Sequence, residues 1–253
     1  MSPAIRASYA VLFAVSGAGP AGVAVHELSE VTSMHSRTVY RHLRSLRELG
    51  LVDAGSHAGK FVLGPVAAGL AVRAVDQRTF LKRAQEVADE VTENSQEPAH
   101  VTVYHHGTAV TVAAASEAVG QTTSTVPIVL GSRRPAHASA SGKVFLAFNE
   151  SARAAYLVRP LEQFTPFTVT DSETFLARCR EVRHQGFSTD VQENTLGVSC
   201  IAVPVRGPRG HVAASIVIST TNPAMPTDRQ EQLLSVLQPA AAEFSLSIGG
   251  DQR

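Results

Sequence analysis

The sequence lacks the features that would place it in a membrane, in a disulfide scaffold or around a metal cluster. Its two cysteines, Cys179 and Cys200, are too few for a disulfide framework or a cysteine-based metal site. No apolar run reaches the roughly 18 residues that a membrane-spanning helix needs, and the first twenty residues show no clear cleavage pattern of a secretory signal. We therefore predict a cytoplasmic protein that has no membrane contact, metal or cofactor.

The chain also lacks net charge, internal repeats and low-complexity segments. Its 22 Lys and Arg residues balance 22 Asp and Glu residues, which excludes a nonspecific, strongly basic nucleic-acid coat. The basic excess is local, because residues 1–65 carry six basic and four acidic side chains. With 253 residues, 44% of them hydrophobic, the chain can form one small and one larger domain. If the chain binds DNA, we therefore expect binding to depend on a few arginines at defined positions and on two copies of the chain that bind one DNA site together.

Residues 24–64 have the pattern of a winged helix-turn-helix. A short helix is predicted over 25–31, a turn over 32–34 and a longer helix over 36–49, which Gly50 can end in the left-handed conformation. Strands are predicted at 51–52 and 60–63, with a glycine-bearing turn between them as the wing. An earlier helix that ends at Gly17 would complete a three-helix core. This arrangement is typical of DNA-binding regulators.

The predicted helix 36–49 has an apolar face and a basic face. The apolar residues are Val39, Leu43, Leu46 and Leu49, and the basic residues are Arg37, Arg41, Arg44 and Arg47. Arginine suits phosphates and guanine edges because its planar guanidinium donates two parallel hydrogen bonds. His42 adds a further donor. We predict DNA contacts from this helix and the wing, at Ser36, Arg37, Thr38, Tyr40, Arg41, Arg44, His57 and Lys60.

The remainder of the chain predicts a linker helix at 66–78 and an α+β domain at 79–253, after a DNA-binding domain at 1–65. A largely antiparallel sheet is expected from strands at 100–105, 109–115, 122–129, 187–191, 199–205 and 212–219. Helices are expected at 141–148, 151–158, 172–185 and 227–248. Capping patterns that begin at Thr170 and Thr227 precede the last two helices. Helices packed on one sheet make the fold class two-domain α+β.

Several stretches, in order along the chain, resemble the IclR family of transcriptional regulators. They are SRTVYRHL (36–43) with LRELG (46–50), FVLG (61–64), PAHASASGK (135–143) and ENTLGVSCIAVPV (193–205). The resemblance covers nearly the whole chain and implies a winged helix-turn-helix, a linker helix and a GAF-like effector-binding domain. It further implies a ligand-responsive regulator, more often a repressor, that binds a pseudo-palindromic operator as a homodimer or homotetramer.

In this family the effector is a small organic acid or an aromatic compound bound at one end of the C-terminal sheet. The resemblance implies effector contacts at five positions of this chain: Ala140, Ser141, Asp190, Cys200 and Ser219. Ala140 and Ser141 begin a predicted helix, whose free N–H groups would attract a carboxylate. Val217 stands where some members have a second serine, which favours a more apolar effector. Such a pocket would have apolar walls, for which the candidates are Val129, Leu130, Phe148 and Phe164.

Two other classes of function compete with this interpretation. An enzyme would use Cys200 as a nucleophile with one of ten histidines, but the apolar run 199–205 favours a buried, inert thiol. A sensory or protein-interaction module without operator binding would not need the four arginines of helix 36–49. Asp190 and Glu193 also have a plain interpretation as solvated carboxylates at a strand end.

Two apparent motifs predict neither a metal site nor a nucleotide-binding loop. His105 and His106 are adjacent on a predicted strand, so their side chains point to opposite faces and do not readily share a metal ion. Ser141-Gly142-Lys143 resembles part of a phosphate-binding loop, but it lacks the preceding glycine and the following serine or threonine. We therefore expect neither a metal centre nor nucleotide hydrolysis.

Overall fold

The structure, a computed structural model, describes residues 2–18, 21–76, 79–115, 128–221 and 224–250. The chain divides into two compact units, Met1–Thr79 and Phe80–Arg253. None of the helices in the described ranges combines the length and hydrophobicity that a bilayer crossing requires.

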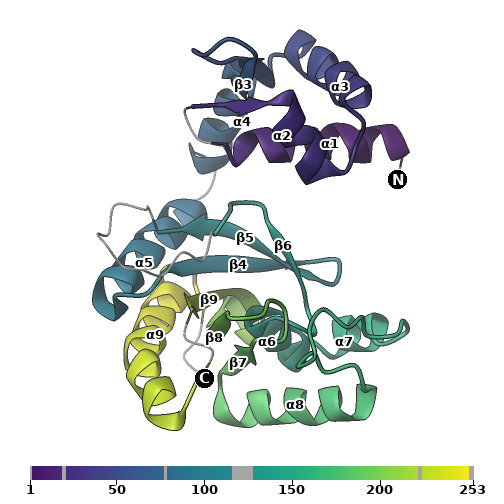
Figure 1. The fold of residues 1–253 in the computed structure, drawn as a ribbon. Helices are drawn as coiled ribbons and strands as arrows, with labels where there is room; N and C mark the ends of the chain where they lie inside the picture. The colour runs from purple at the N-terminus through teal and green to yellow at the C-terminus, as the bar shows by residue number, and fades with distance from the viewer. Residues whose placement is uncertain (1, 19–20, 77–78, 116–127, 222–223, 251–253) are drawn as a thin grey trace. The chain divides into compact units, whose positions relative to one another are not determined.

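The N-terminal unit joins three packed helices to a small antiparallel sheet (Figure 1). Its elements are α1 (Pro3–Ser16), β1 (Val23–Ala24), α2 (Val25–Thr32), α3 (Ser36–Glu48), β2 (Val52–Ala54), β3 (Lys60–Leu63) and α4 (Pro65–Asp76). Strand β3 lies between β1 and β2 and pairs with both. The sequence predicted the helices and the β2–β3 ribbon, but it did not predict β1, whose two residues are too few to show an alternating pattern.

The core of this unit is built from valine and leucine side chains of α1, α2 and α3. Leu28 of α2 is fully buried, and the apolar face predicted for α3 is confirmed at Val39, Leu43 and Leu46. The prediction is wrong at Leu49, which follows the helix and is 63% exposed. The winged helix-turn-helix architecture predicted for residues 24–64 is thus present in the N-terminal unit.

The C-terminal unit is a six-stranded antiparallel sheet with helices on both faces. Its helices are α5 (Thr79–Ser95), α6 (Ala140–Phe148), α7 (Glu150–Tyr156), α8 (Ser172–Gln185) and α9 (Thr227–Ser247), with a short 3-10 turn at Pro208–Gly210. Its strands are β4 (Ala99–His105), β5 (Thr108–Ala114), β6 (Arg133–Pro135), β7 (Ser188–Val191), β8 (Ser199–Arg206) and β9 (Val212–Thr220). They lie in the order β6-β5-β4-β9-β8-β7.

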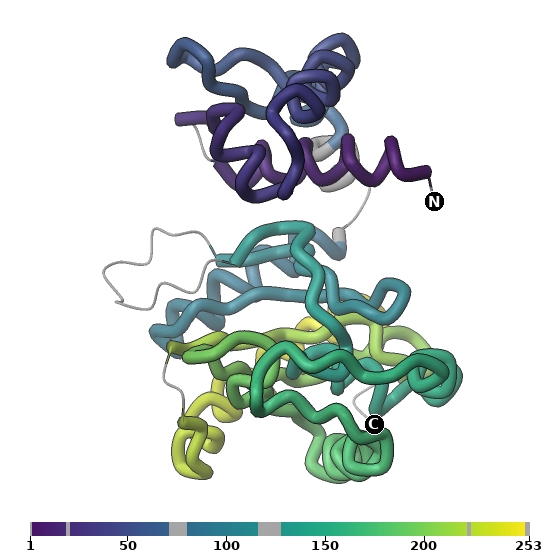
Figure 2. Tube along the Cα trace, turned by 45° about the vertical axis from the view of Figure 1, so that its right-hand side comes forward, coloured from purple at the N-terminus to yellow at the C-terminus, as the bar shows by residue number. Residues whose placement is uncertain are grey.

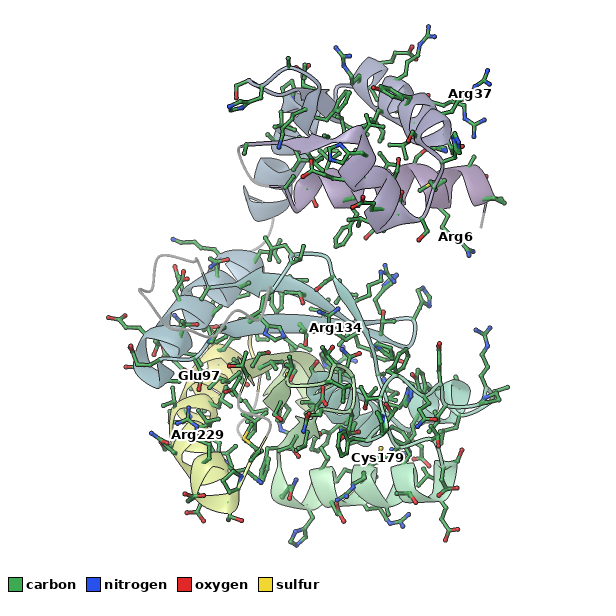
Figure 3. The ribbon with its side chains drawn as sticks, viewed as in Figure 1. Arg6, Arg37, Glu97, Arg134, Cys179 and Arg229 are labelled. Carbon is green, nitrogen blue, oxygen red and sulfur yellow. The ribbon has the colours of Figure 1, made fainter. Side chains whose placement is uncertain are left out.

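The two faces of this sheet have separate cores, because successive side chains of a strand point to opposite faces. Helices α5 and α9 cover one face (Figure 2). Ile201, Ile216 and Ile218 are fully buried there, in one core with Phe244. Helices α6 and α8 cover the other face, where Val144, Phe175 and Val217 are buried. Glu97, before β4, pairs with Arg229 of α9 at 2.7 Å (Figure 3).

Several predicted details of this unit need correction. Asp171, not Thr170, caps α8, and its carboxylate accepts a hydrogen bond from the Thr174 N–H at 2.7 Å. Helix α9 starts after Pro226 and has no side-chain cap. Of the predicted strand 122–129, residues 122–127 lie outside the described residues, and residues 128–129 are not in a strand. Strand β6 was not predicted.

Candidate DNA-reading surface and effector site

Helix α3 presents its basic face to solvent. Arg37, Tyr40, Arg41 and Arg44 are exposed, and Thr38 is half-buried. Figure 3 shows Arg37 extending away from the N-terminal unit. Because Val39 and Leu43 fix the opposite face in the core, these side chains are held outward on a rigid helix.

The start of α3 is fixed by short polar contacts. The His35 side chain accepts a hydrogen bond from the Arg37 N–H at 3.3 Å and so caps the helix. The exposed Ser36 hydroxyl lies 3.1 Å from the Ser29 hydroxyl of α2. The turn between the helices depends on Ser33, whose φ of +53° is left-handed. These contacts position the N-terminal turn of α3, where a recognition helix reaches deepest into a groove.

One residue of α3, His42, differs from the prediction. His42 is buried, and its Nδ1 lies 2.9 Å from the Ser8 hydroxyl of α1, so its ring ties two helices together instead of facing DNA. Burial, with a smaller effect of Arg41, lowers the pKa of His42. Arg44 is exposed but pairs with Glu48 one turn later at 3.1 Å.

The wing is the β2–β3 hairpin, whose turn spans residues 55–59. His57 is exposed in this turn, and its carbonyl accepts a hydrogen bond from the Lys60 N–H at 3.1 Å. Lys60 is half-buried at the start of β3, with its Nζ 3.9 Å from Glu27 of α2. His57 is therefore less restrained by side-chain contacts than Lys60, the other predicted wing residue.

A hollow of about 470 Å³ lies beside α3. It is lined by Tyr40, Leu43, Arg44, Arg47, Glu48, Gly50, Val52, Asp53, Phe61 and Pro65.

In the C-terminal unit the strand register brings three of the predicted effector residues together. Asp190 on β7 pairs with Cys200 on β8, and Cys200 pairs with Ser219 on β9. Directly paired residues in an antiparallel sheet project to the same face, so the three side chains form one row. The Cys200 Sγ lies 3.3 Å from the Ser219 Oγ. We call Asp190, Cys200 and Ser219 the strand row.

The other two predicted effector residues begin α6, which packs on the same face of the sheet. Ala140 and Ser141 are almost fully buried, and no side chain caps the helix. The Ser139 hydroxyl, in the N-cap position, instead donates to the Pro135 carbonyl at 2.8 Å. The first turn of α6 thus keeps amide groups without a side-chain acceptor, as an anion site requires.

A buried ion pair that the sequence did not predict lies beside the strand row. The Lys143 ammonium group of α6 pairs with the carboxylate of Glu193, and both side chains are largely buried. The interpretation of Glu193 as a solvated carboxylate is therefore wrong. A lysine within the otherwise apolar stretch Ala140–Phe148 was the available signal, because a buried lysine needs a partner.

Asp190 is buried as well, which contradicts its interpretation as a solvated carboxylate. Its Oδ1 accepts hydrogen bonds from the N–H groups of Glu193 at 2.7 Å and Asn194 at 3.4 Å. Burial raises the pKa of Asp190 to about 7, although Lys143 and these N–H groups act in the opposite direction. The strand row therefore contains a carboxyl group that changes charge near neutral pH.

The environment of Cys200 does not suit a nucleophile. Burial raises the pKa of its thiol to about 12, with a further contribution from Asp190, and its hydrogen-bond neighbour is Ser219. A protonated thiol is a poor nucleophile. Cys179 on α8 is also buried, with a pKa raised to about 11. Among the described residues, no three His, Cys, Asp or Glu side chains are grouped as metal ligands would be.

Two of the proposed apolar walls, Phe148 and Phe164, have ring contacts of their own in the C-terminal unit. Phe148 ends α6, about 12 Å along the helix from Ala140, and its ring lies under Arg206 at 4.7 Å. Phe164 instead contacts the His137 ring, with centroids 5.7 Å apart. His137 itself is buried, and its Nδ1 lies 2.7 Å from the Tyr156 hydroxyl. This His137–Tyr156 contact, 19 residues apart in sequence, was not predicted.

Comparisons with known proteins identify both units of the chain. The family model described as the C-terminal domain of the bacterial transcriptional regulator IclR matches residues 72–246. A second model, for bacterial regulatory proteins of the arsR family, matches residues 11–54. The Pca operon regulatory protein of Acinetobacter baylyi is 31% identical over 223 residues, which are 85% of this chain and 78% of that protein.

Solved structures share the fold over almost the full length. An IclR transcriptional regulator from Alicyclobacillus acidocaldarius has a TM-score of 0.77 and 23% identity, covering 98% of this chain and 100% of the other. An IclR homologue from Microbacterium hydrocarbonoxydans, in complex with 4-hydroxybenzoate, has a TM-score of 0.73 and 22% identity, covering 97% and 98%. The chain therefore belongs to the IclR family of bacterial transcriptional regulators, with an N-terminal helix-turn-helix domain and a C-terminal effector-binding domain.

Proposed function

We propose that the chain, acting in the cytoplasm as a homodimer or homotetramer, represses transcription by binding a pseudo-palindromic operator through α3 and the wing. The observation that carries this proposal is the exposed basic face of α3 above a fully buried apolar face. Arg37, Thr38, Tyr40 and Arg41 are the proposed groove contacts, and Ser36, Arg44, His57 and Lys60 the proposed backbone contacts. The proposed domain limits are 1–65, 66–78 and 79–253.

Self-association is supported by apolar side chains left exposed in the N-terminal unit. Ile5 and Tyr9 of α1 are 63% and 49% exposed, and Val66 and Leu70 of α4 are 46% and 58% exposed. Exposed apolar side chains that join into one patch commonly mark protein interfaces. Two copies would present two α3 helices to successive turns of one DNA face, as a palindromic operator requires.

Arg41→Ala tests the proposed DNA contact. If Arg41 reads a base, its loss should weaken operator binding by about 1–3 kcal/mol in a gel-shift titration. Arg44→Ala is the matched control on the same helix, and it should have a smaller effect because Arg44 already pairs with Glu48. Binding of the Arg41 variant equal to that of the wild type would exclude this role.

For the effector, we propose a small organic acid or aromatic acid held by the first turn of α6 and by the strand row. Uncapped amides at Ala140 and Ser141 support a carboxylate there, and the Cys200–Ser219 pair supplies neutral polar atoms. Binding would change DNA affinity only if the two states of the protein bind the effector differently.

The effector site can be probed with 4-hydroxybenzoate, the ligand of the Microbacterium homologue. Ser219→Ala removes a buried hydroxyl of the strand row and should reduce the thermal shift caused by this acid. Ser235→Ala, an exposed serine of α9, is the control and should leave the shift unchanged. Equal shifts for wild type and Ser219→Ala would remove Ser219 from the proposed site.

A further inference from the structure

An arginine of the edge strand β6 lies on the same face of the sheet as the strand row. Arg134 pairs with Ala109 on β5, and Ala109 pairs with Tyr104 on β4, so these three residues project to one face. The Tyr104 ring packs against Phe145 of α6 with centroids 5.8 Å apart. Arg134 is labelled in Figure 3. The Arg134 side chain thus shares a face with the effector residues.

The neighbouring arginine provides an internal comparison. Arg133 pairs with Val110, which pairs with Val103 of β4. Val103 packs with the core under α5 and α9, on the opposite face of the sheet. The two adjacent arginines are both exposed, but their side chains lie on opposite faces of the sheet. Only Arg134 lies on the face that α6 covers.

The charge of Arg134 affects the pKa of two groups in this unit. Burial lowers the pKa of His100 on β4 to about 3, and Arg134 lowers it further. Burial raises the pKa of Cys200, while Arg134 acts against that rise. Neighbouring strands are about 4.8 Å apart, and β5, β4 and β9 separate β6 from β8. The positive charge of Arg134 therefore affects the pKa of Cys200 in the strand row, although three strands lie between β6 and β8.

Arg134 is exposed and takes part in none of the ion pairs found among the described residues. No described carboxylate lies within ion-pair distance of its guanidinium, whereas Lys143 on the same face is paired with Glu193. His100 is neutral, and its buried Nδ1 has no hydrogen-bond partner among the described residues. His100 pairs with Val217 of β9, which lies in the core under α6, so the unpartnered Nδ1 and the Arg134 side chain are on the same face of the sheet. A polar ligand on this face would supply contacts to both groups.

We propose that Arg134 binds a second acid group of the effector, so that the effector is a small diacid. This inference rests on the proposed effector site. One carboxylate is held by the amides of Ala140 and Ser141, and the other is held by the Arg134 guanidinium, whose two parallel N–H groups match a carboxylate. His100 contributes one neutral hydrogen bond beside the second group. The two binding groups lie on different elements, β6 and α6. The site would therefore select diacids whose two acid groups have the matching spacing.

Matched pairs of monoacids and diacids test the proposal on the full chain. The probes are butyrate with succinate, hexanoate with adipate, and 4-methylbenzoate with terephthalate, and dissociation constants are measured by calorimetry. In at least one pair the wild type should bind the diacid about tenfold or more tightly than the monoacid, as expected for a hydrogen bond to a charged group. Arg134→Gln should abolish this preference, and Arg133→Gln should retain it.

Each other outcome contradicts the inference. Equal affinities for diacid and monoacid in the wild type, or a preference that survives Arg134→Gln, would remove Arg134 from effector recognition. If all six acids failed to bind, the diacid class would be wrong. Operator affinity is measured in parallel on the same samples, so a failure of the proposed regulatory function is recognised separately, by the absence of selective DNA binding in the wild type.

Discussion

Lys143 is a lysine only 3% exposed on α6, with its ammonium group against Glu193. Removing one partner of a buried ion pair leaves the other charge uncompensated, which costs about 3–5 kcal/mol. Here both Glu193 and the nearby Asp190 would lose the cation. Lys143→Met should therefore lower the free energy of unfolding by about that amount in urea titrations.

The control for Lys143 is an exposed lysine with a carboxylate partner. Lys82 on α5 lies 3.8 Å from Glu86, and its side chain is 74% exposed. Lys82→Met should change stability by about 0.5 kcal/mol or less, because exposed pairs contribute little. Similar losses for the two variants would show that the Lys143–Glu193 pair is not a buried interaction.

Asp190 makes stability depend on pH. Burial raises its pKa to about 7 in the folded chain, from an ordinary value of 3.8. Between these values the folded chain binds a proton that the unfolded chain has lost, so stability falls as pH rises from about 4 to 7 and is level above that. A pKa difference of one corresponds to about 1.4 kcal/mol. The total change attributable to Asp190 is thus several kcal/mol.

Asp190→Asn isolates this contribution. Asparagine keeps an acceptor for the N–H groups of Glu193 and Asn194 but cannot ionise. The stability of the wild type relative to the variant should therefore decrease between pH 5 and pH 8, measured by urea unfolding at each pH. An unchanged difference at the two pH values would mean that Asp190 ionises normally.

At the scale of elements, α6 approaches the chain before it closely enough to require glycine. A Cβ at Gly142 would lie 2.3 Å from the Ala136 Cα and 2.4 Å from its carbonyl oxygen, both rigid backbone atoms. Gly142→Ala should destabilise the C-terminal domain by about 1–3 kcal/mol through this overlap. Thermal unfolding measures the effect.

Gly69 of α4 is the control for Gly142, because a Cβ there would meet nothing within 4 Å. Gly69→Ala should be neutral or stabilising by up to about 1 kcal/mol, since alanine is the better helix former. Opposite signs for the two substitutions are expected. A neutral Gly142→Ala would contradict the close packing of α6 on Ala136.

The long elements were predictable because local signals agree with tertiary structure. Helix α8 has the predicted limits Ser172–Gln185 and ends at Gly186, whose φ is +82°. The start of the same helix was less predictable, because Thr170 and Asp171 are both plausible caps and only the folded loop selects one. Strands β1 and β6 are two and three residues long, so neither has enough alternation to be recognised.

Some site residues could be predicted from the local sequence, and others could not, because their roles depend on contacts with residues far away in the chain. The outward arginines of α3 follow from helical spacing alone. His42 was misassigned because its partner, Ser8, is 34 residues away on α1. Lys143 and Glu193 are 50 residues apart, and they meet because α6 packs beside the loop after β7. Composition and spacing carry no information on which distant residues become neighbours.

At the scale of the whole molecule, one chain carries a DNA-reading unit and an effector-binding unit. If the proposed effector weakens operator binding, operator DNA must weaken effector binding by the same factor, because the coupling is reciprocal. DNA affinity should also fall steeply with salt, since placed arginines displace counterions from phosphates.

The most direct test is a fluorescence-anisotropy titration of the purified protein with the DNA upstream of its own gene and of neighbouring genes. It is made at two salt concentrations and in the presence of competitor DNA. The proposed function predicts tight binding to one such sequence that survives the competitor at the higher salt. Weak binding that is equal for unrelated DNA and is lost at the higher salt would contradict it.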